Sequence, residues 1–236
     1  MNYSSSMQEQ ILDIAGLKTH LVGAIAQAQP LLVLLHGYAM TPADLTPFAH
    51  SLQIPAVVLV PRGPHVSPTG GYCWWNIDTE ARSVALAAGP RDLALEHPGG
   101  LPAARSQLAD FMAAAAGQLH PCRTLVGGFS QGGMLACDQV LHVSSKIDGL
   151  IMMSASRIAG EDWQLRRAAL HGLRTFISHG RTDLDLSFAA GESLRDFMVS
   201  NQAKVTWVPF DQGHEIPLVV WRELRKFIRA IIDSPV

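Results

Sequence analysis

A serine flanked by glycines carries the clearest chemical signal in the chain. Residues 128–132 read Gly-Phe-Ser-Gln-Gly, which fits the pattern G-x-S-x-G. Residues 124–126 before this pattern are typical of a buried strand, and residues 133–143 after it are typical of a helix. This order is that of a nucleophile elbow, a sharp turn that exposes Ser130 and needs glycine on either side. The alternative is a glycine-rich turn with an incidental serine, but the strand and helix context favours the elbow.

A serine hydroxyl is a weak nucleophile until a base removes its proton, so Ser130 needs a histidine and an acid beside it. His214 follows Gly213 at the predicted end of the last strand, and imidazole is the side chain whose ordinary pKa lies near neutral. Asp183 follows another predicted strand end and would hold the imidazole in one tautomer. Nucleophile, acid and histidine therefore occur in the order of a known triad. We predict Ser130, Asp183 and His214 as catalytic residues.

Alternatives stay open around this set. Asp183 would also suit the cap of the helix that follows it, and Asp185 competes for the role of the acid. His179 lies before the turn rather than at its tip, and we interpret it as structural. His36 is interpreted as a residue that organises a loop.

Acyl transfer also requires donors for an oxygen that becomes negative. The backbone N–H of Gln131, at the start of the predicted helix, is one such donor. The second is expected from the loop after Leu35, where the N–H of Tyr38 is our choice and that of Ala39 comes next.

Strand and helix patterns alternate along the chain. An opening hairpin is expected at 10–14 and 19–24, and buried strands are expected at 31–35, 56–60, 124–126, 148–153, 175–178 and 204–210. Amphipathic helices are expected from Thr41, from Pro102, around Leu194 and over 220–231. This alternation predicts an α/β fold, a mostly parallel central sheet with helices on both faces, in a single domain over residues 1–236.

Residues 61–101 are the least regular part of the chain, and a stretch of this length is usually functional or partly folded. We treat it as an irregular insertion and a candidate lid over the active site. It contains Trp74 and Trp75. Adjacent tryptophans either anchor a loop to the core or line a substrate pocket, and both interpretations stay open.

Bulk properties narrow the class of function. The 236 residues are 48% hydrophobic and 16% charged with a net charge of -2, which argues against disorder and gives no electrostatic case for nucleic acid or an anionic membrane. No apolar run reaches transmembrane length, and residues 1–10 lack a secretion signal. Three cysteines, none spaced as a metal site, favour a reducing compartment. We expect a cytoplasmic protein without stable membrane insertion and without a metal; a homodimer is left open.

At four places the sequence resembles the phospholipase/carboxylesterase family of α/β-hydrolases, which includes the acyl-protein thioesterases. The similar segments are His36-Gly37, residues 127–133, His179-Gly-x-x-Asp183 and residues 213–217, with a weaker similarity at 74–78. The resemblance implies an α/β-hydrolase fold and a serine esterase that needs no cofactor. It places the triad on Ser130, Asp183 and His214 and the oxyanion donors on Tyr38 and Gln131.

The chain departs from the family pattern in two loops. Tyr38-Ala39-Met40 follows His36-Gly37, and Leu184-Asp185-Leu186-Ser187 follows Asp183. These departures bear on the substrate more than on the reaction. The sequence therefore predicts a serine carboxylesterase acting on small to medium acyl esters. The alternatives are an acyl thioesterase or lysophospholipase and, from another class, a catalytically silent binding module of the same fold.

Overall fold

The computed structural model describes residues 10–26 and 28–235. The polar residues 1–9, for which the sequence predicts no secretion signal, lie outside the described residues, as do Gln27 and Val236.

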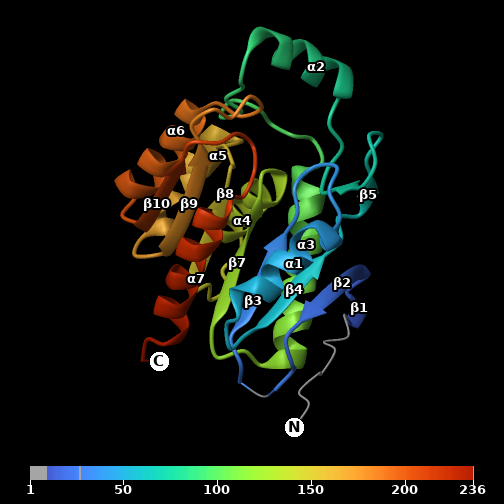
Figure 1. Cartoon of the computed structure of the whole chain (residues 1–236), viewed down its shortest axis with the longest axis vertical. Coiled ribbons are helices and arrows are strands. Elements are labelled where there is room, and N and C mark those ends of the chain that lie inside the picture. The colour runs from blue at the N-terminus through green and yellow to red at the C-terminus, as the bar shows by residue number, and fades with distance from the viewer. Residues whose placement is uncertain (1–9, 27, 236) are drawn as a thin grey trace.

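A central eight-stranded sheet organises the described chain (Figure 1). Its spatial order is β1-β2-β4-β3-β7-β8-β9-β10. The strands are β1 Gln10–Ile14, β2 Leu17–Val22, β3 Leu31–Leu35, β4 Val57–Pro61, β7 Thr124–Phe129, β8 Gly149–Met153, β9 Arg174–Gly180 and β10 Lys204–Phe210. The pairs from β4 to β10 are parallel, and only β1 with β2 and β2 with β4 are antiparallel.

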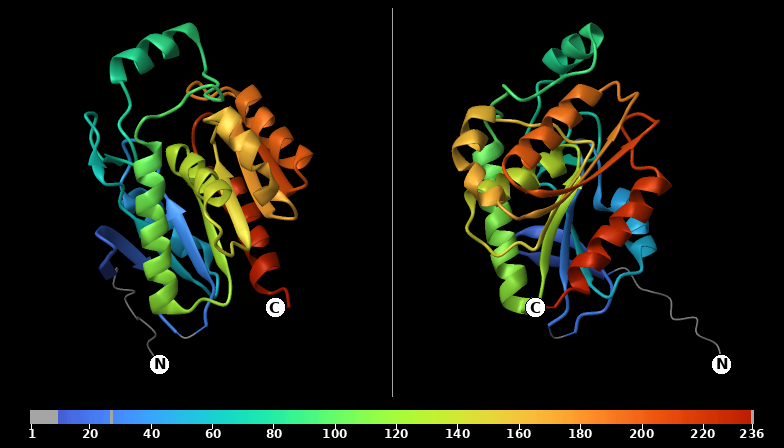
Figure 2. Two further views of the ribbon diagram at one scale, coloured as in Figure 1. Left: turned by 180° about the vertical axis from the view of Figure 1, so that it is seen from behind. Right: turned by 90° about the vertical axis from the view of Figure 1, so that its left-hand side faces the viewer.

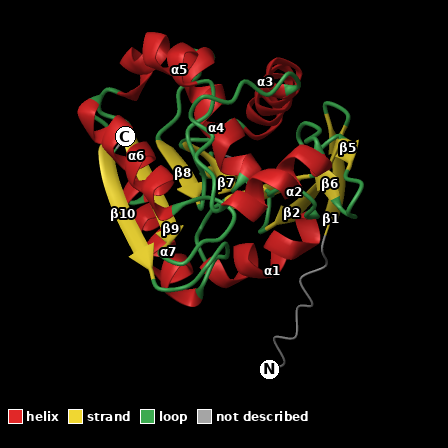
Figure 3. Ribbon diagram, turned by 90° about the horizontal axis from the view of Figure 1, so that it is seen from above, coloured by secondary structure: helices red, strands yellow, loops and turns green. Residues whose placement is uncertain are grey.

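Helices cover both faces of this sheet, as Figure 2 and the view from above in Figure 3 show. Those on one face are α3 Leu101–Leu119, α4 Gln131–His142, α5 Gly160–Arg166 and α6 Phe188–Ser200, whereas α1 Pro42–Leu52 and α7 Leu218–Ile232 lie on the other. Strand β3 shows why both faces are needed, since all five of its residues are buried. Leu31, Val33 and Leu35 pack toward α3 and α4, while Leu32 and Leu34 pack toward α1 and α7.

This architecture confirms the predicted α/β fold with a mostly parallel sheet. The opening hairpin is also as expected, although its second strand begins earlier, at Leu17. The strand before Ser130 extends to Phe129 rather than Val126, and the helix after it begins at Gln131 rather than Gly133. The glycines hide both extensions because they break the apolar pattern without ending the hydrogen-bonded elements.

The irregular segment 61–101 is partly folded. It contains a small hairpin, β5 His65–Val66 with β6 Tyr72–Cys73, and a ten-residue helix, α2 Thr79–Ala88. No residue of α2 is buried, and the helix stands away from the body of the molecule at the end where the parallel strands finish (Figures 1 and 2). Helix α2 is not predicted from the sequence because its alanines give no continuous apolar stripe. Its start is nevertheless marked by Asp78, which accepts hydrogen bonds from the amides of Glu80 and Ala81.

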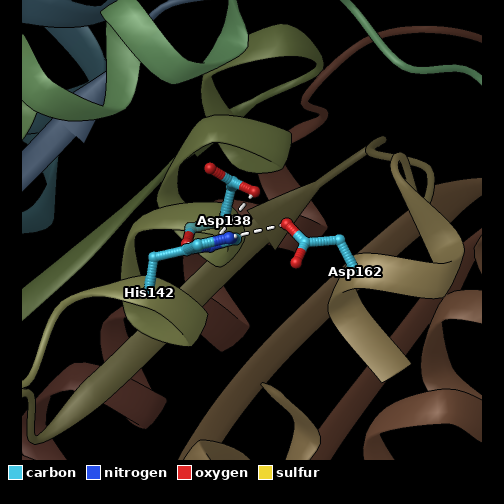
Figure 4. Close-up of side chains that lie close together, drawn as sticks. All are labelled: Asp138, His142 and Asp162. Carbon is cyan, nitrogen blue, oxygen red and sulfur yellow. Dashed lines mark hydrogen bonds and ion pairs between the residues drawn. The ribbon is translucent and has the colours of Figure 1, made fainter. Parts of the chain in front are cut away.

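A buried charge ties α4 to its neighbours. The Asp138 side chain is inaccessible to solvent; it accepts hydrogen bonds from Arg105 of α3 at 3.1 Å and from the Trp163 indole of α5 at 3.0 Å. His142 and Asp162 continue this network toward the surface (Figure 4). Asp138 is therefore the polar junction of three helices on one face of the sheet.

Replacing Asp138 with alanine should destabilise the protein by about 3 kcal/mol, because it leaves the Arg105 and His142 groups without their buried partner. Urea unfolding measures this change in the free energy of unfolding. Asp162→Ala is the matched control; its carboxylate is 39% exposed, and its loss should change stability by less than about 1 kcal/mol. Equal effects of the two substitutions would contradict the assigned role of Asp138.

Candidate active site

Ser130 occupies a strained turn between β7 and α4. Its backbone has φ 51° and ψ −118°, a conformation that residues with side chains rarely adopt. A Cβ at Gly128 would lie 2.3 Å from the carbonyl oxygen of Leu35, and one at Gly132 would lie 2.4 Å from the same oxygen. Both glycines are therefore required by the close approach of the turn to the end of β3. The Ser130 amide donates to the carbonyl of Met153 at 2.8 Å, which ties the turn to β8.

The three predicted catalytic residues meet in one hydrogen-bonded chain. His214 Nδ1 lies 2.7 Å from Asp183 Oδ2, and His214 Nε2 lies 3.0 Å from Ser130 Oγ. Because a carboxylate only accepts, Nδ1 carries the imidazole proton, and Nε2 is left to accept from the serine hydroxyl. The Asp183 side chain is fully buried, whereas that of His214 is 21% exposed. This arrangement can transfer a proton from Ser130 to His214 while Asp183 stabilises the imidazolium.

Neighbouring loops position the acid and the histidine. The loop after β9 carries Asp183, and Asp183 Oδ1 accepts from the amides of Asp185 and Leu186 at 2.8 and 2.9 Å. The loop after β10 carries His214. The two loops touch so closely that a Cβ at Gly180 would lie 2.2 Å from the carbonyl oxygens of residues 212 and 213. Since β9 and β10 are parallel neighbours, their ends bring the two side chains together.

The loop after β3 lies against Ser130. A Cβ at Gly37 would approach the Cβ of Ser130 to 3.3 Å, so this backbone passes directly beside the serine. Tyr38 follows and lines the same cavity as Ser130 and Gln131. Ala39, the second choice as a donor, has a left-handed backbone with φ 60°. Gln131 is the first residue of α4, where an amide has no partner within the helix. Two predicted oxyanion donors thus come from elements that meet at Ser130.

The side chain of Gln131 has a structural task that the sequence analysis missed. Its Oε1 accepts from the amide of Trp74, and its Nε2 donates to the carbonyl of Trp75, both at 2.9 Å. Gln131 thereby fastens the tryptophan segment to the start of α4. Trp74 and Gln131 are 57 residues apart, so no local sequence pattern predicts their hydrogen bond. The only signal is the position of the glutamine directly after Ser130.

The two tryptophans have different surroundings: Trp74 anchors the loop to the core, and Trp75 lines the cavity. Trp74 is 1% exposed, its indole donates to the carbonyl of His36 at 2.9 Å, and its ring lies 5.4 Å from the His36 ring. It anchors the segment, and the residues that line the cavity at Ser130 do not include it. Trp75 does line that cavity.

The cavity beside Ser130 has a volume of about 610 Å³, within the usual range for small-molecule sites. Its apolar lining comes mainly from six side chains: Trp75, Ile77, Leu93, Met134, Ile158 and Leu186. Ala81, Ala85 and Ala88 place α2 along its outer side.

Comparison with known proteins places this chain in a family. The sequence profile of the phospholipase/carboxylesterase family matches residues 19–232. The chain belongs to the phospholipase/carboxylesterase family. This membership confirms the resemblance deduced from the motifs, and it makes the protein an α/β-hydrolase. A comparison with curated proteins gave no match.

Solved structures share the fold at low sequence identity. Esterase PE8 is 23% identical with a TM-score of 0.77, and the alignment covers 91% of this chain and 99% of that one. A carboxylesterase from Mesorhizobium loti is 19% identical with a TM-score of 0.74, covering 93% and 98%. Acyl-protein thioesterase 2 from Zea mays is 18% identical with a TM-score of 0.72, covering 91% and 98%. Among the described residues, no helix is both long and apolar enough to span a membrane.

Asp185, the alternative candidate for the acid, forms ion pairs with two arginines and does not contact His214 in the described hydrogen bonds. Its carboxylate pairs with Arg82 of α2 and with Arg91. Burial by itself would raise the pKa of Asp185. The hydrogen bond and the charge of Arg91 lower it, as do the charges of His214 and Arg82, so the pKa lies below its ordinary value. Asp183, rather than Asp185, therefore makes the contact with His214.

His36 organises the loop that carries Tyr38. Its Nε2 accepts from the amide of Gly63 at 2.9 Å, so its Nδ1 carries the proton and donates to the carbonyl of Gly37 at 2.7 Å. Burial lowers the pKa of His36 to about 4, against the opposing effects of the Gly37 hydrogen bond and the Asp44 charge. The neutral ring thus joins the end of β3 to the turn after β4.

A cluster of possible metal ligands lies outside the site. Atoms of Asp138, His142 and Asp162 come within 4.8 Å of one another (Figure 4). Each is already engaged by protein groups: Asp138 by Arg105 and Trp163, and His142 by the Asp138 carbonyl and Asp162. The geometry is that of a hydrogen-bonded network between α4 and α5.

The neutral His36 makes a pH-dependent contribution to stability. Its folded pKa of about 4 lies below the ordinary value of 6.5, so the unfolded chain binds this proton first as the pH falls. Stability should decrease from about pH 6.5 toward pH 4, by on the order of 3 kcal/mol for this group. Urea unfolding at pH 7 and pH 4.5 measures the loss, and His36→Asn should show a smaller one. An unchanged slope in His36→Asn would refute the assignment.

Proposed function

We propose that this protein is a serine carboxylesterase that hydrolyses small to medium acyl esters through an acyl-enzyme. The observation that carries the proposal is the chain of hydrogen bonds from Ser130 through His214 to Asp183, which begins at a cavity of about 610 Å³. A catalytically silent member of the fold would have no need of this complete chain.

In the proposed reaction, the substrate carbonyl lies against Ser130 with the acyl chain in the apolar cavity. His214 Nε2 takes the hydroxyl proton as Ser130 Oγ forms its bond to the carbonyl carbon. The amides of Tyr38 and Gln131 stabilise the negative oxygen of the tetrahedral intermediate. His214 then gives its proton to the leaving alcohol as the ester bond breaks.

Water completes the proposed cycle. Its oxygen forms a bond to the acyl carbon while His214 Nε2 accepts one of its protons. The bond from that carbon to Ser130 Oγ then breaks, Ser130 Oγ takes the proton from His214, and the carboxylic acid leaves. Nucleophile, base and oxyanion donors all come from the chain, so these steps need neither a metal nor another cofactor. The same steps apply to a thioester, and the structural similarity to a plant acyl-protein thioesterase supports testing that substrate class as well.

The lining of the cavity supports an acyl group of limited length. Apolar side chains surround the serine, while charged groups of Arg82, Arg91 and Asp185 lie in the same lining. We propose further that α2 is a lid that forms the outer wall of this cavity. With no buried residue of its own, a helix of this length is marginal in isolation, and its position depends on its Asp78 cap and on the Arg82–Asp185 ion pair.

Hydrolysis of nitrophenyl esters of increasing acyl length tests the reaction. Ser130→Ala should lower kcat by about 10⁴-fold or more, and it should abolish covalent labelling by a fluorophosphonate. Ser144→Ala, an exposed serine in the loop after α4, should behave as wild type. A folded wild-type protein that neither turns over esters or thioesters nor labels would refute the enzyme in favour of the silent binding module.

The lid predicts a separate kinetic effect. Arg82→Ala releases α2 from Asp185, so KM for the longer acyl esters should rise several-fold while kcat for the shortest ester stays near wild type. Hydrogen exchange over residues 79–88 should become faster. The control is Ser83→Ala, the exposed next residue of the same helix. The lid proposal fails if KM is the same at every acyl length in both variants.

A further inference from the structure

The imidazole of His179 is buried beside the proposed triad, yet none of the steps above uses it. His179 is the second-to-last residue of β9, four residues before Asp183, and it is 0% exposed. The ring packs tightly, since a Cβ at Gly191 of α6 would lie 2.5 Å from it. Phe188 covers it from 6.3 Å, ring centre to ring centre.

The oxygens around His179 fix its tautomer. Its Nε2 lies 3.0 Å from the carbonyl oxygen of Leu186 and 3.4 Å from Asp183 Oδ2. Both oxygens are acceptors, so Nε2 must carry the proton. Burial lowers the pKa of His179. The Leu186 hydrogen bond and the Asp183 charge raise it in part, and the His214 charge lowers it further. A neutral ring with its proton on Nε2 fits this environment.

His179 lies next to the proposed catalytic acid and is hydrogen-bonded to the loop that carries it. Asp183 Oδ1 accepts the amides of Asp185 and Leu186, whereas Oδ2 faces His214 and His179. The bond to the Leu186 carbonyl also closes the loop from Asp183 to Leu186 against β9. Without this N–H, the buried Leu186 carbonyl would lose its donor, and Asp183 Oδ2 would lose a neighbouring N–H at 3.4 Å.

We propose that His179 is a positioning residue, whose Nε2–H holds the Asp183 carboxylate and its loop in the orientation that His214 requires. This inference rests on the proposed esterase function. It assigns His179 a role in the reaction in place of the purely structural one expected from the sequence.

Two substitutions separate the N–H group from the bulk of the ring. His179→Phe keeps an aromatic side chain and removes the donor, whereas His179→Gln restores an N–H near the position of Nε2. His142→Phe is the matched control, because it removes a partly buried, hydrogen-bonded histidine of α4 outside the proposed site. The readouts are kcat and KM on a short nitrophenyl ester and the low-field NMR resonance of the His214 Nδ1 proton, which reports its bond to Asp183.

His179→Phe should lower kcat by about 10- to 100-fold with little change in KM, since a misplacement on the order of 1 Å can reduce a rate about 10²-fold. The His214 resonance should weaken or disappear with it. His179→Gln should recover most of both signals, and His142→Phe should retain them. Full activity and an intact resonance in folded His179→Phe would overturn the proposal, as would equal losses in the phenylalanine and glutamine variants.

A measurement on the wild-type protein covers the case in which His179→Phe does not fold. Nitrogen chemical shifts should show a neutral His179 ring with its proton on Nε2. A proton on Nδ1 alone, or a charged ring at pH 7, would overturn the proposal. Because the resonances need no substrate, they stay informative if ester hydrolysis fails, and so they distinguish the failure of this inference from that of the proposed function.

Discussion

The close approach of the Ser130 turn to the end of β3 is the constraint on which the rest of the site depends. The carbonyl oxygen of Leu35 occupies the space that a side chain at either Gly128 or Gly132 would need. This contact sets the strained backbone of Ser130 and places the loop at Gly37 beside the serine. Ser130 and the loop at Gly37 are therefore positioned by one piece of packing between neighbouring parallel strands.

Two buried histidines complete the framework with opposite tautomers. The proton of His36 is on Nδ1 because its Nε2 accepts a backbone amide, whereas that of His179 is on Nε2 because this atom faces only acceptors. Burial lowers the pKa of both rings, which keeps them neutral while they join backbone segments. His214 differs from both because it is partly exposed and pairs with a carboxylate. Histidines of one sequence thus take different roles according to burial and to the atoms that face each nitrogen.

The outer wall of the cavity is exposed, whereas its floor belongs to the hydrophobic core. The floor is core, formed by strand ends and by the start of α4. The wall is α2, which buries no residue and is connected through Arg82 to Asp185, two residues beyond Asp183. A buried floor with an exposed wall suits the proposed reaction, which must hold its reacting groups still while a substrate enters.

Local patterns determined much of this protein. Apolar runs and helical spacing identified the parallel sheet and most of its helices, because burial on both faces leaves a continuous record in residue type. The G-x-S-x-G pattern and the strand ends at Asp183 and His214 identified the three residues that the structure joins by hydrogen bonds. Chain order and strand-end position suffice here, since parallel strands deliver their loops to one edge of the sheet.

Tertiary structure alone decided the contacts between distant segments. The sequence could not predict which tryptophan anchors the loop and which lines the cavity, since this depends on which indole donates to the His36 carbonyl. It favoured Asp183 over Asp185 but gave no partner for Asp185, because that requires the positions of Arg82 and Arg91 about a hundred residues away. It also left α2 unrecognised and His179 without a partner. In each case the deciding partner is set by packing and charge in three dimensions, for which neighbouring residues in the chain carry no pattern.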